Sequence, residues 1–186
     1  MKKSIKSIVF ALSFTLGSIG ASAQMGNVMV GGAAMYSQKN IVENAINSKD
    51  HTTLVAAVKA AGLVEALMGK DPLTVFAPVN SAFANLPAGT VETLLKPENK
   101  ATLAKILTYH VVAGKIDGKE LLSRIEKGNG EAKLKTLSGG TLTAKKNGEM
   151  NISIFDEKGG MANISIYNVY QSNGVIHSID SVLLPM

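Results

Sequence analysis

The spacing of hydrophobic residues changes about halfway along the chain. From residue 40 to about residue 109, apolar side chains recur at helical intervals. Leu54, Val58 and Ala61 form one such stripe, which is expected to begin after a cap at Asp50 and to end at Gly62. The pattern predicts short helices over residues 41–46, 51–61, 63–68, 81–86, 91–95 and 97–109.

One strand is expected inside this helical half. Residues 73–76 are mostly β-branched or aromatic, and Pro78 and then Asn80 and Ser81 follow them. Asn and Ser side chains satisfy the free N–H groups of a first helical turn. The segment therefore predicts a strand that ends at a helix N-cap.

The C-terminal half changes to a period of two. Pairs such as Ile152/Ile154 and Ile164/Ile166 alternate with polar residues, as in strands with one buried face. Turn signals separate expected strands at 111–116, 141–146, 149–155, 161–170 and 174–184, with a helical or turn piece at 118–125. Helices followed by an antiparallel meander predict an α+β domain.

The first 23 residues have the pattern of an export signal. Lys2, Lys3 and Lys6 precede an apolar stretch, and Ala21 and Ala23 form an A-x-A cleavage pattern. The apolar stretch is shorter than the roughly 20 residues that a spanning helix needs, so no membrane span is expected. We expect cleavage after Ala23, a Gly/Met-rich and partly ordered arm over residues 24–39, and a domain over residues 40–186.

Composition limits the compartment and the partners. The chain has 186 residues and no cysteine, so it forms no disulfide. Its formal charge of +5 includes three lysines of the signal, which leaves +2 for the remainder. Basic residues are not clustered and aromatic residues are sparse, so nucleic acid is not an expected partner. We expect an exported protein, either periplasmic or extracellular.

Three segments carry a resemblance to a known family. Residues 73–83 (LTVFAPVNSAF, the first motif) and residues 173–185 (NGVIHSIDSVLLP, the second motif) resemble the two signature segments of the fasciclin domain. Residues 107–114 (LTYHVVAG) are similar to the family's Tyr-His stretch. The positions that match the two motifs are Thr74, Phe76, Ala77, Pro78, Asn80, Phe83, Gly174, His177 and Asp180.

The resemblance spans about residues 40–185 and implies both a fold and a role. It implies a fasciclin-like antiparallel β-sandwich of about seven strands, with several short helices packed at one end. It also implies a secreted adhesion module. Two positions differ from the family's pattern, namely Val79 and Ser178.

The Tyr109-His110 pair is a candidate binding site. In animal members of the family a Tyr-His motif with flanking Leu and Val residues is linked to integrin binding, and Leu107 and Val111 flank the pair here. The same apolar spacing is also what a helix and a strand facing the core require. Both interpretations stay open on the sequence alone.

The second motif places His177 in a buried strand. A buried imidazole needs hydrogen-bond partners for its ring nitrogens. Asn80 ends the strand of the first motif and is a natural candidate. We therefore expect the two motifs to lie side by side, with His177 and Asn80 in contact, whereas His51 is expected at the surface.

No pattern of a metal site or a catalytic site is found. His51, His110 and His177 show no metal-ligand spacing, and the chain has no G-x-S-x-G sequence and no phosphate-binding loop. We expect no cofactor, no metal and no enzymatic activity. Met25, Met29 and Met35 could bind Cu(I) through thioethers, or could serve as flexible apolar residues of the arm.

The sequence thus favours a non-enzymatic module that mediates attachment. Its expected partners are a cell-surface or matrix protein, a polysaccharide, or a second copy of the chain. The alternative is a periplasmic protein that handles a small ligand or copper, through the Met-rich arm or a pocket near Tyr109.

Overall fold

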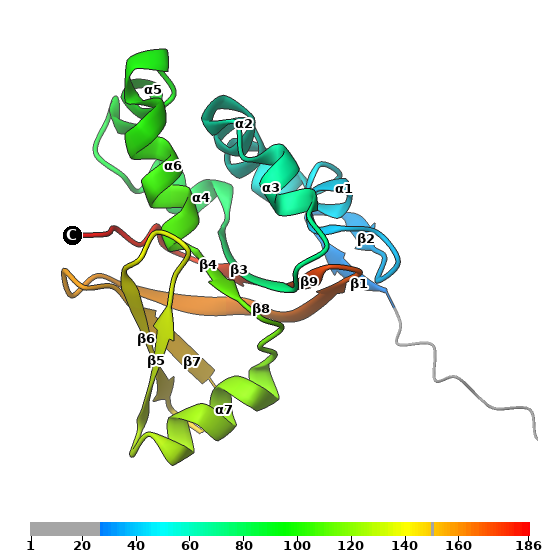
Figure 1. The fold of residues 1–186 in the computed structure, drawn as a ribbon, viewed down its shortest axis with the longest axis vertical. Helices are drawn as coiled ribbons and strands as arrows, with labels where there is room; N and C mark the ends of the chain where they lie inside the picture. The colour runs from blue at the N-terminus through cyan, green and yellow to red at the C-terminus, as the bar shows by residue number, and fades with distance from the viewer. Residues whose placement is uncertain (1–26, 150) are drawn as a thin grey trace, which may run out of the picture.

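The computed structural model describes residues 27–149 and 151–186 (Figure 1). The export signal and Met25 lie outside these residues. The helices of the described part are α1 Ile41–Ala45, α2 Thr52–Ala61, α3 Val64–Met68, α4 Asn80–Ala84, α5 Thr90–Leu94, α6 Lys100–Tyr109 and α7 Gly118–Lys127, with 3-10 turns at Lys49–His51 and Pro97–Asn99. The strands are β1 Val28–Val30, β2 Ala33–Met35, β3 Leu73–Pro78, β4 Val111–Ala113, β5 Glu131–Lys135, β6 Thr141–Asn147, β7 Asn151–Phe155, β8 Met161–Gln171 and β9 Gly174–Ile179.

Seven strands form one sheet in the order β4-β3-β9-β8-β7-β6-β5. The two ends of this sheet approach each other, because Val112 forms a bridge with Thr136 and Leu137 N donates to Val111 O over 2.8 Å. The sheet is therefore barrel-like and nearly closed. The expected α+β class and the number of strands are confirmed, whereas the expected sandwich is wrong, since one sheet curls onto itself instead of two sheets packing face to face.

One pair of strands breaks the antiparallel pattern. β3 and β9 run parallel, with Leu73 opposite Gly174 and Pro78 opposite Ile179, and β3 also pairs with β4 in antiparallel fashion. Parallel neighbours need a long connection, and here helices α4–α7 and strands β4–β8 lie between the two strands in the sequence. Both strands are buried along their entire length, as expected for strands covered on two faces.

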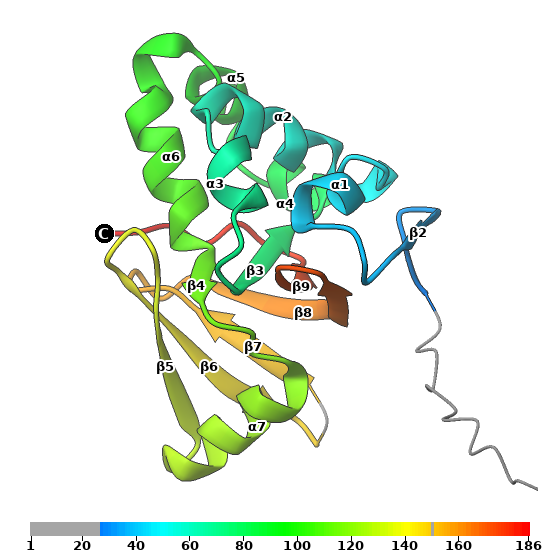
Figure 2. The same cartoon turned by 45° about the vertical axis from the view of Figure 1, so that its right-hand side comes forward.

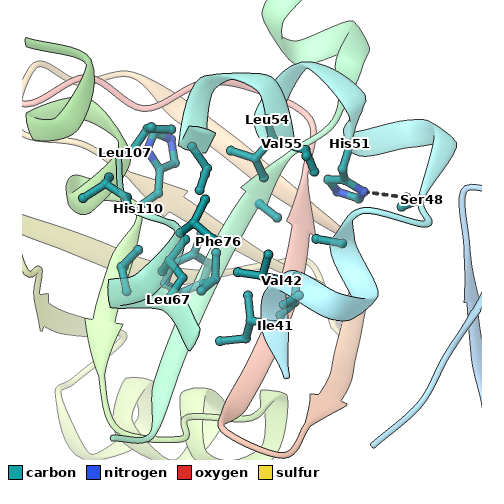
Figure 3. Close-up of a pocket in the computed structure, with 18 of the residues that line it drawn as sticks. Ile41, Val42, Ser48, His51, Leu54, Val55, Leu67, Phe76, Leu107 and His110 are labelled. Atoms are coloured by element: carbon teal, nitrogen blue, oxygen red, sulfur yellow. Dashed lines mark hydrogen bonds between the residues drawn. The ribbon is translucent and has the colours of Figure 1, made fainter. Parts of the chain in front are cut away.

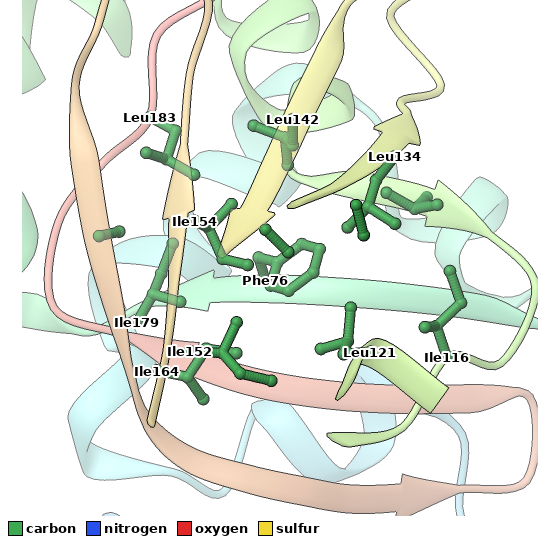
Figure 4. Packing of buried hydrophobic residues seen from close by; sticks show 14 of the residues in the cluster. Phe76, Ile116, Leu121, Leu134, Leu142, Ile152, Ile154, Ile164, Ile179 and Leu183 are labelled. Carbon is green, nitrogen blue, oxygen red and sulfur yellow. The ribbon is translucent and has the colours of Figure 1, made fainter. Parts of the chain in front are cut away.

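Two hydrophobic clusters lie on opposite faces of this parallel pair. Phe76 and Ile179 point into the barrel, where they meet residues of β5–β8 and α7 (Figure 4). Val75 and Ile176 point the other way, into a cluster formed with α1, α2 and α6. Figure 2 shows helices α1–α6 gathered on one side of β3 and β9, while α7 lies near β5 on the other side. The alternation of side chains along two strands thus divides the core into a barrel half and a helical half.

Two features of the fold have no counterpart in the sequence prediction. Residues of the expected arm form the β1–β2 hairpin, whose Val30 and Met35 are buried in the helical cluster. Strand β5 was not expected, because three of its five residues are Glu or Lys and a fourth is Ala, which are depleted in strands, although Ala132 and Leu134 alternate with them and face the core.

Candidate functional site

The two sequence motifs lie side by side, as expected. Phe76 is opposite His177 in the parallel register, and their rings stack with centroids 5.7 Å apart. The ring of Tyr167 meets the same imidazole edge-on. His177 is fully buried, and burial lowers its pKa, so the neutral ring is the folded form.

The hydrogen bonds of His177 differ from the expected ones. Its Nε2 is 2.9 Å from Ile116 O, and its Nδ1 is 3.4 Å from the backbone N of Asn168. The imidazole therefore joins β9 to the segment before α7 and to an irregular part of β8. The expected contact with Asn80 is wrong.

Asn80 instead caps a different helix from its own. Its Oδ1 accepts from Thr53 N over 3.0 Å and from the Thr52 hydroxyl, and its Nδ2 donates to Lys49 O over 2.8 Å. The residue before α4 is Val79, which makes no side-chain cap, and the expected cap of α2 at Asp50 is replaced by the 3-10 turn. Asn80 thus satisfies free donors at the start of α2 from across the chain.

The remaining motif residues also have structural contacts. Thr74 donates to Gly114 O and accepts from Ile116 N, which fixes the segment between β4 and α7. Asp180 accepts from the backbone N and the side-chain amide of Asn163 on β8. Ala77 and Pro78 are buried on β3, and Phe83 is half-buried against the helical cluster.

The Asn-Gly pair at 173–174 has a role beyond its turn. Asn173 Oδ1 accepts from Ile41 N, and its Nδ2 donates to Leu67 O and Gly69 O. A Cβ on Gly174 would collide with the carbonyl oxygen of Leu73. The pair therefore ties α1 and α3 to the end of β9, a function that its local turn signal does not reveal.

Tyr109 and His110 are both interior residues. The Tyr109 hydroxyl donates to Thr141 O over 3.0 Å and accepts from Glu157 N over 3.1 Å. His110 places Nδ1 2.8 Å from Ile106 O, and its Nε2 accepts from Leu183 N over 3.0 Å. Burial lowers the pKa of His110 to about 4. Each ring thus joins α6 to strands or loops, and the direct binding role of the pair stays a prediction.

An apolar cavity of about 120 Å³ lies between the helices and the β3–β9 face (Figure 3). Aliphatic side chains from α1, α2, α3, β3 and β9 form most of its wall, and His110 borders one end. At the other end, Ser48 Oγ is 2.9 Å from His51 Nδ1, and Ser178 Oγ is 3.4 Å from His51 Nε2. His51 is buried, so its expected place at the surface is wrong, and burial lowers its pKa.

Met29 and Met35, the described methionines of the expected arm, do not form a common site. Met29 is 59% exposed and pairs with Ala34, whereas Met35 is buried and pairs with Val28, so the two point to opposite faces of the hairpin. Among the described residues no group of His, Asp or Glu is arranged to hold a metal ion. Within the same residues no helix has the length and apolar character to cross a bilayer.

The helical layer, the nearly closed sheet and the parallel pairing of its motifs define a domain of the FAS1 type. A FAS1 domain pair from the insect cell adhesion molecule Fasciclin I has the same fold, with a TM-score of 0.70 at 16% identity over 78% of this chain and 51% of that one. The sequence model of the fasciclin domain family matches residues 49–185 of this chain. The chain belongs to the fasciclin domain family, as its three motifs predicted.

Several relatives are similar over most of the chain. Protein sll1483 of Synechocystis is 49% identical over 86% of this chain and 81% of its own length. The immunogenic protein MPB70 of Mycobacterium bovis is 34% identical over 80% of this chain and 70% of its own length. The transforming growth factor-beta-induced protein ig-h3 of the pig is 38% identical over 71% of this chain but only 17% of its own length.

Proposed function

We propose that this chain is an exported, non-enzymatic interaction module that mediates attachment at a cell surface or in a matrix. The observation that carries the proposal is the family match over residues 49–185. The shared fold with an insect cell adhesion molecule supports it, as does the similarity to a cell surface glycolipoprotein of Mycobacterium bovis, which is 34% identical over 83% of this chain. The proposed partner is a surface or matrix protein, a polysaccharide, or a second copy.

The proposed contact surface lies on the helical side. Ile46 directly follows α1 and is 54% exposed, and Met68 at the end of α3 is 41% exposed. Helices α1 and α3 pack against each other, and both are tied to β9 through Asn173. Removing these exposed apolar side chains from water on contact with a partner favours binding.

Bead aggregation tests this proposal. Beads coated with residues 24–186 are expected to cluster, or to bind beads coated with matrix protein or polysaccharide. Ile46→Lys and Met68→Lys are each expected to weaken clustering about tenfold, since they place a charge in an apolar contact. The matched control is Met161→Lys, which changes an exposed methionine on β8, outside the helical side. The proposal would be contradicted if the coated beads neither clustered with one another nor bound beads coated with matrix protein or polysaccharide.

Export is tested separately. The expected first residue of the mature protein is Gln24, which N-terminal sequencing of the protein from periplasm or medium would identify. Recovery of the intact N-terminus from the cytoplasm alone would contradict the exported part of the proposal.

A further inference from the structure

The apolar cavity lies within the helical half of the domain. It lies between the helices and the β3–β9 face, with residues of α1, α2 and α3 in its wall (Figure 3). Val42, Val55, Leu67 and Ile176 are among the aliphatic residues of its wall. An apolar space of this size forfeits packing contacts when it is empty, so a ligand that fills it gains them.

One end of the cavity is polar and fully buried. Ser48, His51 and Ser178 are 2%, 4% and 0% exposed, and they form a short chain of hydrogen-bonding groups. The contact of 3.4 Å between Ser178 Oγ and His51 Nε2 is at the weak limit of hydrogen bonding. The Ser178 hydroxyl can therefore turn toward an oxygen atom inside the cavity at little cost.

We propose that the cavity binds a neutral apolar molecule with one terminal oxygen, such as an alcohol, an aldehyde or a ketone. Its oxygen lies against Ser178 and His51, and its hydrocarbon part lies among the aliphatic side chains. This inference goes beyond attachment, since the cavity is a separate feature from the exposed side chains of the proposed contact surface.

Charge and size define the ligand class. Among the described residues that line the cavity, Lys59 is the only one with a full charge, and it is exposed on α2. Burial lowers the pKa of His51 and so disfavours its charged form, which leaves a carboxylate at that end without a favourable counter-ion. A volume of about 120 Å³ holds a ring or a short chain, and longer ligands would extend past Leu137, which is 51% exposed.

Methyl NMR titrations of residues 24–186 test the proposal with benzyl alcohol, toluene and benzoate as probes. Benzyl alcohol is expected to shift the methyl signals of Val42, Val55 and Leu67 in a saturable way, and benzoate is expected not to bind. Ser178→Ala is expected to weaken benzyl alcohol binding about fivefold, the usual effect of one lost hydrogen bond, and to change toluene binding less than twofold.

A filled cavity provides the second measurement. Val55→Phe places a larger side chain at a half-buried lining position and is expected to abolish binding of both neutral probes. The matched control is Val91→Phe on α5, a half-buried valine outside the cavity. Absence of saturable shifts, retained binding in Val55→Phe, an equal loss of toluene and benzyl alcohol in Ser178→Ala, or tighter binding of benzoate would each overturn the proposal.

Discussion

Phe76 and His177 face each other across the parallel pair β3–β9, with their rings 5.7 Å apart and 24° from coplanar. Each belongs to one of the two sequence motifs of the family. The same imidazole reaches Ile116 O with Nε2 and the backbone N of Asn168 with Nδ1. This residue pair therefore joins the centre of the barrel core to the two segments that complete it.

His177→Phe and His177→Ala separate the stacking from the hydrogen bonds. The phenylalanine keeps an apolar ring beside Phe76 but leaves two buried backbone groups unpaired, which is expected to cost about 2–3 kcal/mol of unfolding free energy. The alanine also leaves a cavity and is expected to cost about 3–5 kcal/mol. Urea unfolding measures both. A neutral effect of either substitution would contradict this role for His177.

Asn80→Ala removes the cap that α2 receives from the first motif. The expected cost is about 1–2 kcal/mol, and Asn80→Asp is expected to cost less because it keeps the acceptor for Thr53 N at a helix N-terminus. Since Asn80 and His177 share no contact, Asn80→Ala and His177→Ala are expected to be additive in urea unfolding, within about 0.5 kcal/mol. A coupling well above that value would show that the two side chains interact.

The sequence predicted those parts of the fold in which local spacing and core packing agree. The stripe that ends at Gly62 forms α2 with a left-handed glycine at its end, and the strands around Ile154 and Ile164 are present. The hairpin was missed because its sequence has no periodicity. The closure of the sheet was missed because it depends on contacts such as that between Val112 and Thr136, which no local pattern encodes.

The candidate site was less predictable than the fold. The cavity wall combines Val42, Leu107 and Ile176, which come from three distant segments. In the sequence, each of them has the pattern of an ordinary core residue. Ser178 was one sequence signal for the polar end of the cavity, because it places a hydroxyl within a buried apolar strand. His51 gave none, because its neighbours in sequence are polar and its burial results from packing against β9.

Asn173→Asp tests the long-range role of the Asn-Gly turn. The carboxylate keeps an acceptor for Ile41 N but cannot donate to Leu67 O or Gly69 O, and it places a buried charge beside two carbonyl oxygens. We expect a loss of about 3 kcal/mol in urea unfolding. The exposed Asn151 serves as the control, where the same change is expected to be nearly neutral. Equal effects at the two positions would mean that the turn acts only locally.

Tyr109→Phe distinguishes a structural role from a binding role. The substitution keeps the buried ring and removes the hydroxyl that joins Thr141 O and Glu157 N. The expected loss is about 1–2 kcal/mol in urea unfolding, with bead aggregation unchanged at a temperature where the variant is folded. Loss of aggregation by a folded variant would instead support direct participation of Tyr109 in binding.

The buried His110 makes stability depend on pH. Its folded pKa is about 4, below the value of about 6.5 in an unfolded chain, because burial disfavours the charged ring and Nε2 must stay unprotonated to accept from Leu183 N. Between these values the unfolded chain binds the extra proton, so stability is fully present above about pH 6.5 and is lost as the pH falls toward about 4. The expected loss from His110 alone is about 2 kcal/mol between about pH 7.5 and about pH 5.

Urea unfolding at several pH values measures this dependence. The lowered pKa values of His51 and His177 add to it in the same direction. His110→Asn is expected to be less stable at neutral pH and to show a flatter profile, since the substituted side chain does not titrate. A profile as steep as that of the unsubstituted chain would show that His110 is not the group responsible, whereas a flat profile in both chains would mean that the buried rings have the same pKa in the folded and unfolded chains.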